Sequence, residues 1–253
     1  MDFEYSKSGN TKRTMRKFSP FMRIFMRLLC ITTLWMLSAG STPGNSSLSK
    51  NWDIAALNTA VKASYLTPNE KDVVLEINKL RANPAAYARE YLEPMLTMYK
   101  GKMLYMPGND PIITREGITA LKDAIRELKN TKPAPPLKPD HRLTLSSRDH
   151  QKDQTRTGKT GHKGSDGTSI SERIARYGNW NKRISENIFY GDPDARSVVL
   201  HLVIDDGVPG RGHRKNFMDP ELNLVGVSCG KHKVYRYMCV MNFAAGFHSS
   251  AGK

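Results

Sequence analysis

Apolar residues recur every three to four positions in two segments of the chain, which is the spacing of one buried helix face. The first segment, residues 73–80, follows a capping box made by Thr67 and Glu70. Pro68 occupies the first helical position after that cap, so we predict a helix that begins there. The second segment, residues 118–128, predicts another amphipathic helix.

The rest of the pattern mixes helices with short strands. Residues 94–114 are rich in proline and glycine and are expected to form a loop, and the prolines of 132–139 exclude a helix there. The other expected elements are helices at 143–157, from Ser169 and from Pro193 with Asp192 as its cap, and strands at 184–189, 225–228 and 234–242. Because this order has no regular βαβ rhythm, the sequence indicates the α+β class.

The N-terminus has the pattern of an export signal. A basic stretch ends at Arg27, a short apolar run follows, and small residues around Ala39 offer a cleavage site. An uncleaved anchor is the alternative, although the run is short for a permanent span, and no run of spanning length follows residue 50. We therefore expect a signal peptide at 1–40, a flexible leader at 41–66, and one folded domain at 67–248 that contains an insertion and proline-rich connection at 94–139.

Charge adds one expectation about partners. The formal net charge is +15, of which residues 1–30 supply +5 and the remainder about +10, spread along the chain. A basic surface attracts anionic partners, so cell-surface polymers are candidate partners of the mature protein. The sequence contains no recognisable nucleic-acid module, and we expect no nucleic-acid partner.

Two cysteines, Cys229 and Cys239, remain if Cys30 is removed with the signal. Export places them where a disulfide persists. They flank a short segment that has the composition of a hairpin turn and second arm, so the two thiols are expected to pair. The alternative is a pair of reduced cysteines that pack as small apolar side chains.

Candidate chemistry gathers in the second half of the chain. Asp205 falls in line with the apolar positions Val198 and Leu202 of the predicted helix, and a carboxylate there needs a partner. A glycine-rich turn then brings His213 close in sequence to that acid. Glu186 interrupts a strand-like run, and His162 lies between glycines, as the sequence of residues 161–164 shows. Taken singly, each of these residues is typical of a structural role.

Together these residues resemble the successive motifs of the CAP family, which comprises cysteine-rich secretory proteins, antigen 5 and pathogenesis-related proteins. The resemblance covers about residues 70–247 and implies a three-layer αβα sandwich around a central, mainly antiparallel sheet. It also implies that a cleft is lined by two histidines and two acids, here His162, Glu186, Asp205 and His213. Two positions depart from the family pattern: Asp205 replaces the more usual glutamate, and Leu202 replaces a common tryptophan. The chain also has fewer cysteines than the secreted animal and plant members.

Two imidazoles with neighbouring carboxylates suit Zn²⁺ or another divalent cation, with His162 and His213 as the expected metal ligands. The same cleft could instead take a small ligand, and resemblance to CAP members that bind lipids makes a lipid one candidate. The same groups could also perform acid–base chemistry in an extracellular hydrolase, hold the cleft together as a structural polar cluster, or belong to a module that docks on the cell envelope. No His-Glu-x-x-His motif or nucleophile elbow is present.

Overall fold

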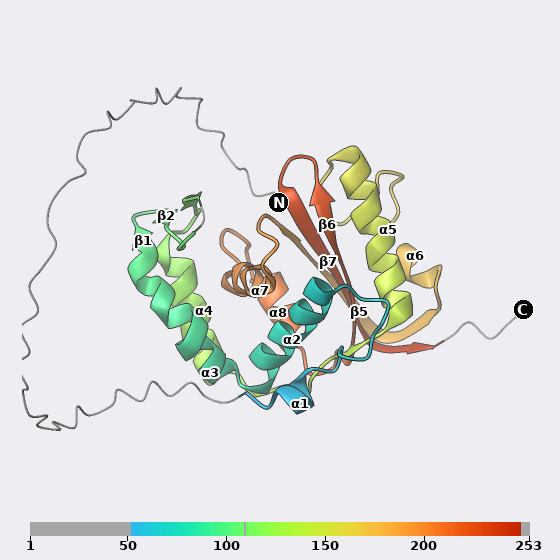
Figure 1. Cartoon of the computed structure of the whole chain (residues 1–253), viewed down its shortest axis with the longest axis horizontal. Helices are drawn as coiled ribbons and strands as arrows, with labels where there is room; N and C mark the ends of the chain where they lie inside the picture. Colours follow the sequence, from blue (N-terminus) through green and yellow to red (C-terminus); the bar gives the residue numbers. More distant parts are fainter. Residues whose placement is uncertain (1–51, 109, 249–253) are drawn as a thin grey trace, which may run out of the picture. The chain divides into compact units, whose positions relative to one another are not determined.

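The computed structural model describes residues 52–108 and 110–248 of the 253-residue chain (Figure 1). The predicted signal peptide at 1–40 and the first part of the predicted leader lie outside these residues.

A four-stranded sheet forms the centre of the domain, with strand order β4-β6-β7-β5. β4 pairs in parallel with β6, and the longer strands pair antiparallel. The predicted strands are thus confirmed, although each is longer than the apolar pattern alone indicated. The bounds are β4 Lys138–Pro139, β5 Asn179–Tyr190, β6 Leu224–His232 and β7 Arg236–His248.

Helices cover both faces of this sheet, which confirms the three-layer αβα architecture (Figure 1). One face carries α5 and α6, and the other carries α2, α7 and α8. The predicted capping box at Thr67 and Glu70 is present at the start of α2, and Gly158 ends α5 in the left-handed conformation. The bounds are α2 Pro68–Ala82, α5 His141–Thr157, α6 Ile170–Ala175, α7 Ala195–Ile204 and α8 Gly212–Met218.

Residues 84–130 form a lobe beside α2 and α7. The amphipathic helix expected from 118–128 is α4, whose apolar side is buried. The loop expected at 94–114 is only partly correct, because a small antiparallel sheet forms within it, with order β1-β2-β3. Its strands are two residues long, too short to show a period-two pattern in the sequence. The bounds are α3 Pro84–Tyr87, a π-helical turn η1 Ala88–Leu92, a 3₁₀ turn η2 Glu93–Met98, β1 Tyr99–Lys100, β2 Met103–Leu104, β3 Ile112–Ile113 and α4 Ile118–Asn130.

The prediction of a flexible leader is wrong for residues 52–66. A short helix, α1 Ile54–Leu57, begins this segment, and Ala60 and Leu66 are buried in the main hydrophobic core. Asn78 of α2 fixes the segment further, because its amide donates to the Leu57 carbonyl at 2.9 Å. The polar composition that suggested a leader ends near residue 51, and the apolar residues after it are too widely spaced to show a helical period.

The helix before the candidate acid begins later than predicted. Asp194, and not Asp192, caps α7, and its carboxylate accepts a hydrogen bond from the Ser197 amide at 2.8 Å. The two aspartates flank Pro193, so the sequence offers two equivalent caps, and the prediction of Asp192 as the cap is wrong. At the other end, Asp205 lies just past the last helical residue.

The Cys229–Cys239 disulfide is present and joins directly opposed positions of β6 and β7. Closing so short a loop restricts the unfolded chain only modestly. We expect reduction to lower the free energy of unfolding by about 2–3 kcal/mol, measured by urea denaturation with and without dithiothreitol. A Cys229→Ala/Cys239→Ala variant should show no response to dithiothreitol. Detection of both thiols in the unreduced, denatured wild-type protein would contradict the pairing.

Candidate functional site

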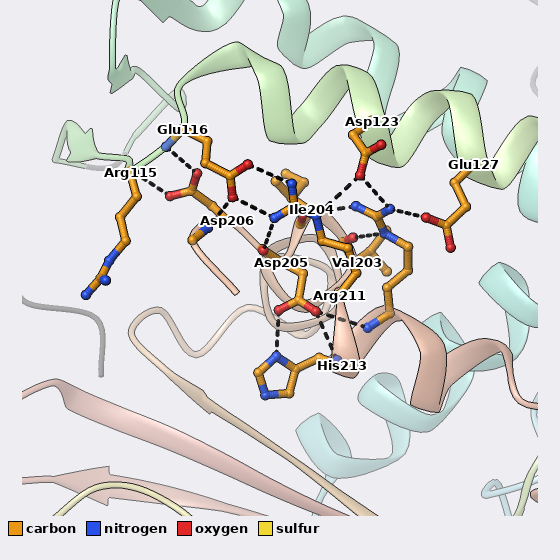
Figure 2. Close-up of polar contacts among 12 residues, drawn as sticks. Arg115, Glu116, Asp123, Glu127, Val203, Ile204, Asp205, Asp206, Arg211 and His213 are labelled. Carbon is orange, nitrogen blue, oxygen red and sulfur yellow. Dashed lines mark hydrogen bonds and ion pairs between the residues drawn. The ribbon is translucent and has the colours of Figure 1, made fainter. Parts of the chain in front are cut away.

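Asp205 is placed at the site by the end of helix α7. Its backbone adopts the left-handed conformation, with φ 56° and ψ 43°, which ends the helix and turns the chain toward α8. The carboxylate accepts a hydrogen bond from His213 Nδ1 at 2.6 Å and another from the His213 amide at 2.9 Å (Figure 2). One side chain therefore fixes both the ring and the backbone of His213.

Glu186 plays the matching part on strand β5. Its Oε1 accepts a hydrogen bond from His162 Nδ1 at 2.9 Å, and its Oε2 accepts one from Arg173 Nη2 at 2.7 Å. Arg173, in α6, also donates to the His162 carbonyl at 2.9 Å. The loop that carries His162 is thus attached to the same carboxylate through its side chain and, by way of Arg173, through its backbone.

The structure brings the four predicted residues together. The ring centres of His162 and His213 are 6.4 Å apart, with an angle of 32° between the planes. Glu186 and Asp205 are buried behind the two rings, whereas the His162 side chain is 55% exposed and that of His213 is 19% exposed. Each acid therefore holds one histidine from the protein side, and the rings form the part of the cluster that solvent reaches.

Neighbouring groups keep Glu186 ionised although it is buried. Burial by itself raises the pKa of Glu186, but the hydrogen bond from His162 and the charge of Arg173 outweigh it. The pKa of Glu186 is therefore below its ordinary value. A carboxylate that stays charged at neutral pH favours the Nδ1–H tautomer of the histidine it holds.

Sequence analysis did not identify Arg173, whose side chain is almost entirely buried between His162 and Glu186. It also missed a link between α8 and β5, in which Asn187 Nδ2 donates to the His213 carbonyl at 3.1 Å and Asn216 donates to Asn187 Oδ1 at 2.8 Å. Asn187 directly follows Glu186 and Asn216 lies three residues after His213, and this nearness to the candidate residues was the available signal. Arg173 lies in an ordinary helical pattern and gave none.

An ion network ties the turn after α7 to helix α4 (Figure 2). Arg211 donates to both carboxylate oxygens of Glu116, at 2.6 and 2.7 Å, and to the carbonyl of Asp205 at 2.8 Å. The hydrogen bonds from Arg211 lower the pKa of Glu116 to about 2. Asp206 points away from the site and accepts hydrogen bonds from the amides of Arg115 and Glu116. The lobe at 84–130 thus supports the segment that carries Asp205 and His213.

The described residues lack two kinds of feature that would define the class of site. Over residues 52–108 and 110–248, no group of three or more His, Cys, Asp and Glu side chains is arranged to hold a metal ion. Across the same described part of the chain, no helix combines the length and apolar character needed to cross a membrane.

Comparison with known proteins assigns the chain to a family. The family model described as CAP, the cysteine-rich secretory protein family, matches residues 75–243. The chain belongs to this family. The matched range contains His162, Glu186, Asp205 and His213 and the two disulfide cysteines, and the αβα sandwich is the fold expected from the resemblance. A search of curated proteins found no match.

Three solved structures resemble the CAP domain of this chain. An extracellular protein with an SCP domain from Bacillus anthracis is 21% identical with a TM-score of 0.36, and the match covers 49% of this chain and 37% of that one. An outer surface protein from Borrelia burgdorferi is 18% identical with a TM-score of 0.38, and the match covers 50% of this chain and 89% of that one. A cysteine-rich secretory protein from Staphylococcus aureus is 14% identical with a TM-score of 0.32, and the match covers 54% of this chain and 41% of that one. The chain thus spans less than half the length of the first and third proteins. At these TM-scores the family assignment rests on the family model.

Proposed function

We propose that this CAP domain acts outside the cytoplasm and binds a divalent cation, with His162 and His213 as its protein ligands. The observation that carries the proposal is the pairing of each imidazole with a buried carboxylate through Nδ1, at 2.9 and 2.6 Å. When Nδ1–H donates to a carboxylate, the lone pair of Nε2 is left for a metal, and the carboxylate increases its basicity.

The spacing of the rings determines how far they must move to share one ion. Two imidazoles on one zinc ion hold their ligating nitrogens at most about 4 Å apart. The ring centres are 6.4 Å apart, and each centre lies a ring radius behind its nitrogen, so even nitrogens that faced each other directly would lie at that upper limit. A tetrahedral zinc ion holds two nitrogens about 3.3 Å apart, so binding requires the two rings to move closer together. Two protein ligands leave further coordination positions for water or for a donor group of a small ligand.

The proposal gives both acids an orienting role, because both are already engaged. Asp205 accepts hydrogen bonds from the ring and the amide of His213, and Glu186 accepts from His162 and Arg173. A carboxylate held in this way orients an imidazole, and the exposed ring nitrogens are the groups left to bind a ligand. The export signal expected at 1–40 and the disulfide support an extracytoplasmic location.

Titration calorimetry with Zn²⁺ tests the site. We expect the wild-type protein to bind one ion, and His162→Ala and His213→Ala each to weaken binding by about 100-fold or more. Glu186→Gln and Asp205→Asn remove only the group that orients the ring, so we expect a loss of about tenfold. Affinity should also fall as the solution is acidified, because an imidazole must be neutral to ligate.

His248→Ala provides a matched control, because His248 is exposed and its ring contacts Asn181 rather than the cleft. This variant should bind Zn²⁺ like the wild type. Wild-type protein that takes up no Zn²⁺ would indicate that the four residues form a structural polar cluster. Unchanged binding in both cleft variants would place the metal elsewhere in the chain.

A further inference from the structure

An apolar pocket is lined in part by Asp205 but by neither His162 nor His213. It opens between the end of strand β5, helix α7 and the small sheet β1–β3, and its volume is about 60 Å³. Ile113, at its edge, is 63% exposed, so apolar surface continues from the pocket to the outside. The apolar or aromatic side chains that line it include Tyr99, Leu104, Ile112, Ile113, Phe189 and Leu202.

His201 supplies a hydrogen-bonding group in this apolar wall. Its Nδ1 is 2.8 Å from the Ser197 carbonyl, so Nδ1 carries the proton and donates it. Nε2 then has a free lone pair, and none of the hydrogen bonds among the described residues reaches it. Burial lowers the pKa of His201, which keeps the ring neutral and keeps Nε2 an acceptor. The ring packs against Phe189, with the centroids 5.4 Å apart.

The charges around the pocket discriminate between classes of ligand. Asp205 and Asp206 contribute to its wall, and within the described part of the chain no lysine or arginine lines it. A ligand carboxylate would have to leave water without a cationic partner and would lie near two acids, which is costly. An uncharged group that donates a hydrogen bond finds its acceptor in His201.

The volume of the pocket further restricts the class of ligand. A buried cavity of about 150 Å³ accommodates benzene, so a pocket of about 60 Å³ with one open side suits a narrow alkyl chain better than a ring system. We propose that this pocket binds a short linear aliphatic alcohol, with its alkyl chain among the apolar side chains and its hydroxyl donating to His201 Nε2. The site uses neither His162 nor His213, so the inference stands apart from the proposed metal function.

An NMR titration of uniformly ¹⁵N-labelled protein in the presence of EDTA tests the ligand class. The probes are 1-hexanol, pentyl methyl ether, which has the same atoms but no donor, and hexanoate. We expect 1-hexanol to shift the amide signals of Phe189, Leu202 and Ile113. The ether should bind about fivefold more weakly, because it cannot make the hydrogen bond. Hexanoate should bind at least tenfold more weakly than 1-hexanol because of its charge. Hexanoate affinity equal to or above that of the alcohol would overturn the proposal, as would the absence of any 1-hexanol binding.

Two variants test the two parts of the pocket. His201→Phe removes the acceptor, so the alcohol and the ether should bind equally well. Leu202→Trp places the larger side chain common in the family against the pocket, so it should reduce 1-hexanol binding at least tenfold. Val234→Trp, at the exposed β6–β7 turn, is the control and should bind like the wild type. An alcohol preference that persists in His201→Phe would overturn the assigned acceptor, and full binding in a folded Leu202→Trp variant would overturn the location.

Discussion

Replacement of Arg81 by methionine should lower the free energy of unfolding by about 3–5 kcal/mol. Arg81 is fully buried in α2, and its guanidinium donates hydrogen bonds to four backbone carbonyls, those of Pro135, Phe217, Asp219 and Leu222, at 2.6–3.0 Å. Methionine fills much of the same space but leaves all four acceptors without a donor. Each unsatisfied buried carbonyl costs about 1–3 kcal/mol, and some of that cost is recovered by relaxation and water.

The carbonyls that Arg81 contacts belong to separate parts of the chain. Pro135 is in the proline-rich connection, and the other three lie at and after the end of α8. Urea denaturation at pH 7 would measure the loss, and Arg126→Met offers a matched control. Arg126 is exposed on α4 and forms an i,i+3 pair with Asp123, so its removal should cost less than about 1 kcal/mol. Equal effects of the two substitutions would contradict the role assigned to Arg81.

The sequence was most informative where a local rule determines the structure. Thr67 and Glu70 satisfy the orphan amides of one helix start by themselves, so the capping box predicted α2 correctly. The relation between Asp205 and His213 was also local, because only a short turn separates them. Their hydrogen bond depends on the left-handed backbone of Asp205, and no residue type signalled that conformation.

Contacts between distant segments could not be predicted from spacing. Arg173 is 13 residues from Glu186 along the chain, and their ion pair forms only because α6 packs beside β5. The link from Arg211 to Glu116 spans 95 residues and depends on where the lobe at 84–130 packs. Resemblance to the CAP family grouped His162, Glu186, Asp205 and His213, which the structure brings together, because it carries tertiary information that the periodicity of one chain lacks. It carried less for this lobe, because within it the resemblance is looser from residue 94 onward.

Loss of the ion pair between Arg173 and Glu186 should have the second large effect, both on the free energy of unfolding and on Zn²⁺ binding. Both side chains are almost completely buried, and their charged atoms are 2.7 Å apart. Arg173→Met removes the cation and leaves the buried Glu186 carboxylate paired with His162. Breaking a buried pair in this way costs about 3–5 kcal/mol. Because Glu186 orients His162, we also expect weaker Zn²⁺ binding in this variant.

The pH dependence of the free energy of unfolding distinguishes loss of this ion pair from loss of packing. In the wild type the pKa of Glu186 is lowered, so its contribution to stability is present above the ordinary glutamate pKa of about 4.3 and is lost as the pH falls through the folded-state value. Without Arg173, burial should raise the pKa of Glu186. The variant then takes up a proton in acid, and the stability gap from the wild type should shrink between pH 7 and pH 5.

A double variant and a neighbouring arginine complete the test. Arg173→Met/Glu186→Gln removes both charges, so it should be more stable at pH 7 than Arg173→Met alone, and its gap from the wild type should vary less with pH over that range. Arg176→Met is the matched control. Arg176 follows the last residue of α6, and its exposed guanidinium is 4.0 Å from the Asp149 carboxylate and 3.7 Å from that of Asp166. Its removal should cost less than about 1 kcal/mol at either pH. A gap for Arg173→Met that stays constant from pH 7 to pH 5 would mean that Arg173 stabilises the domain through packing, and that Glu186 does not depend on it for its charge.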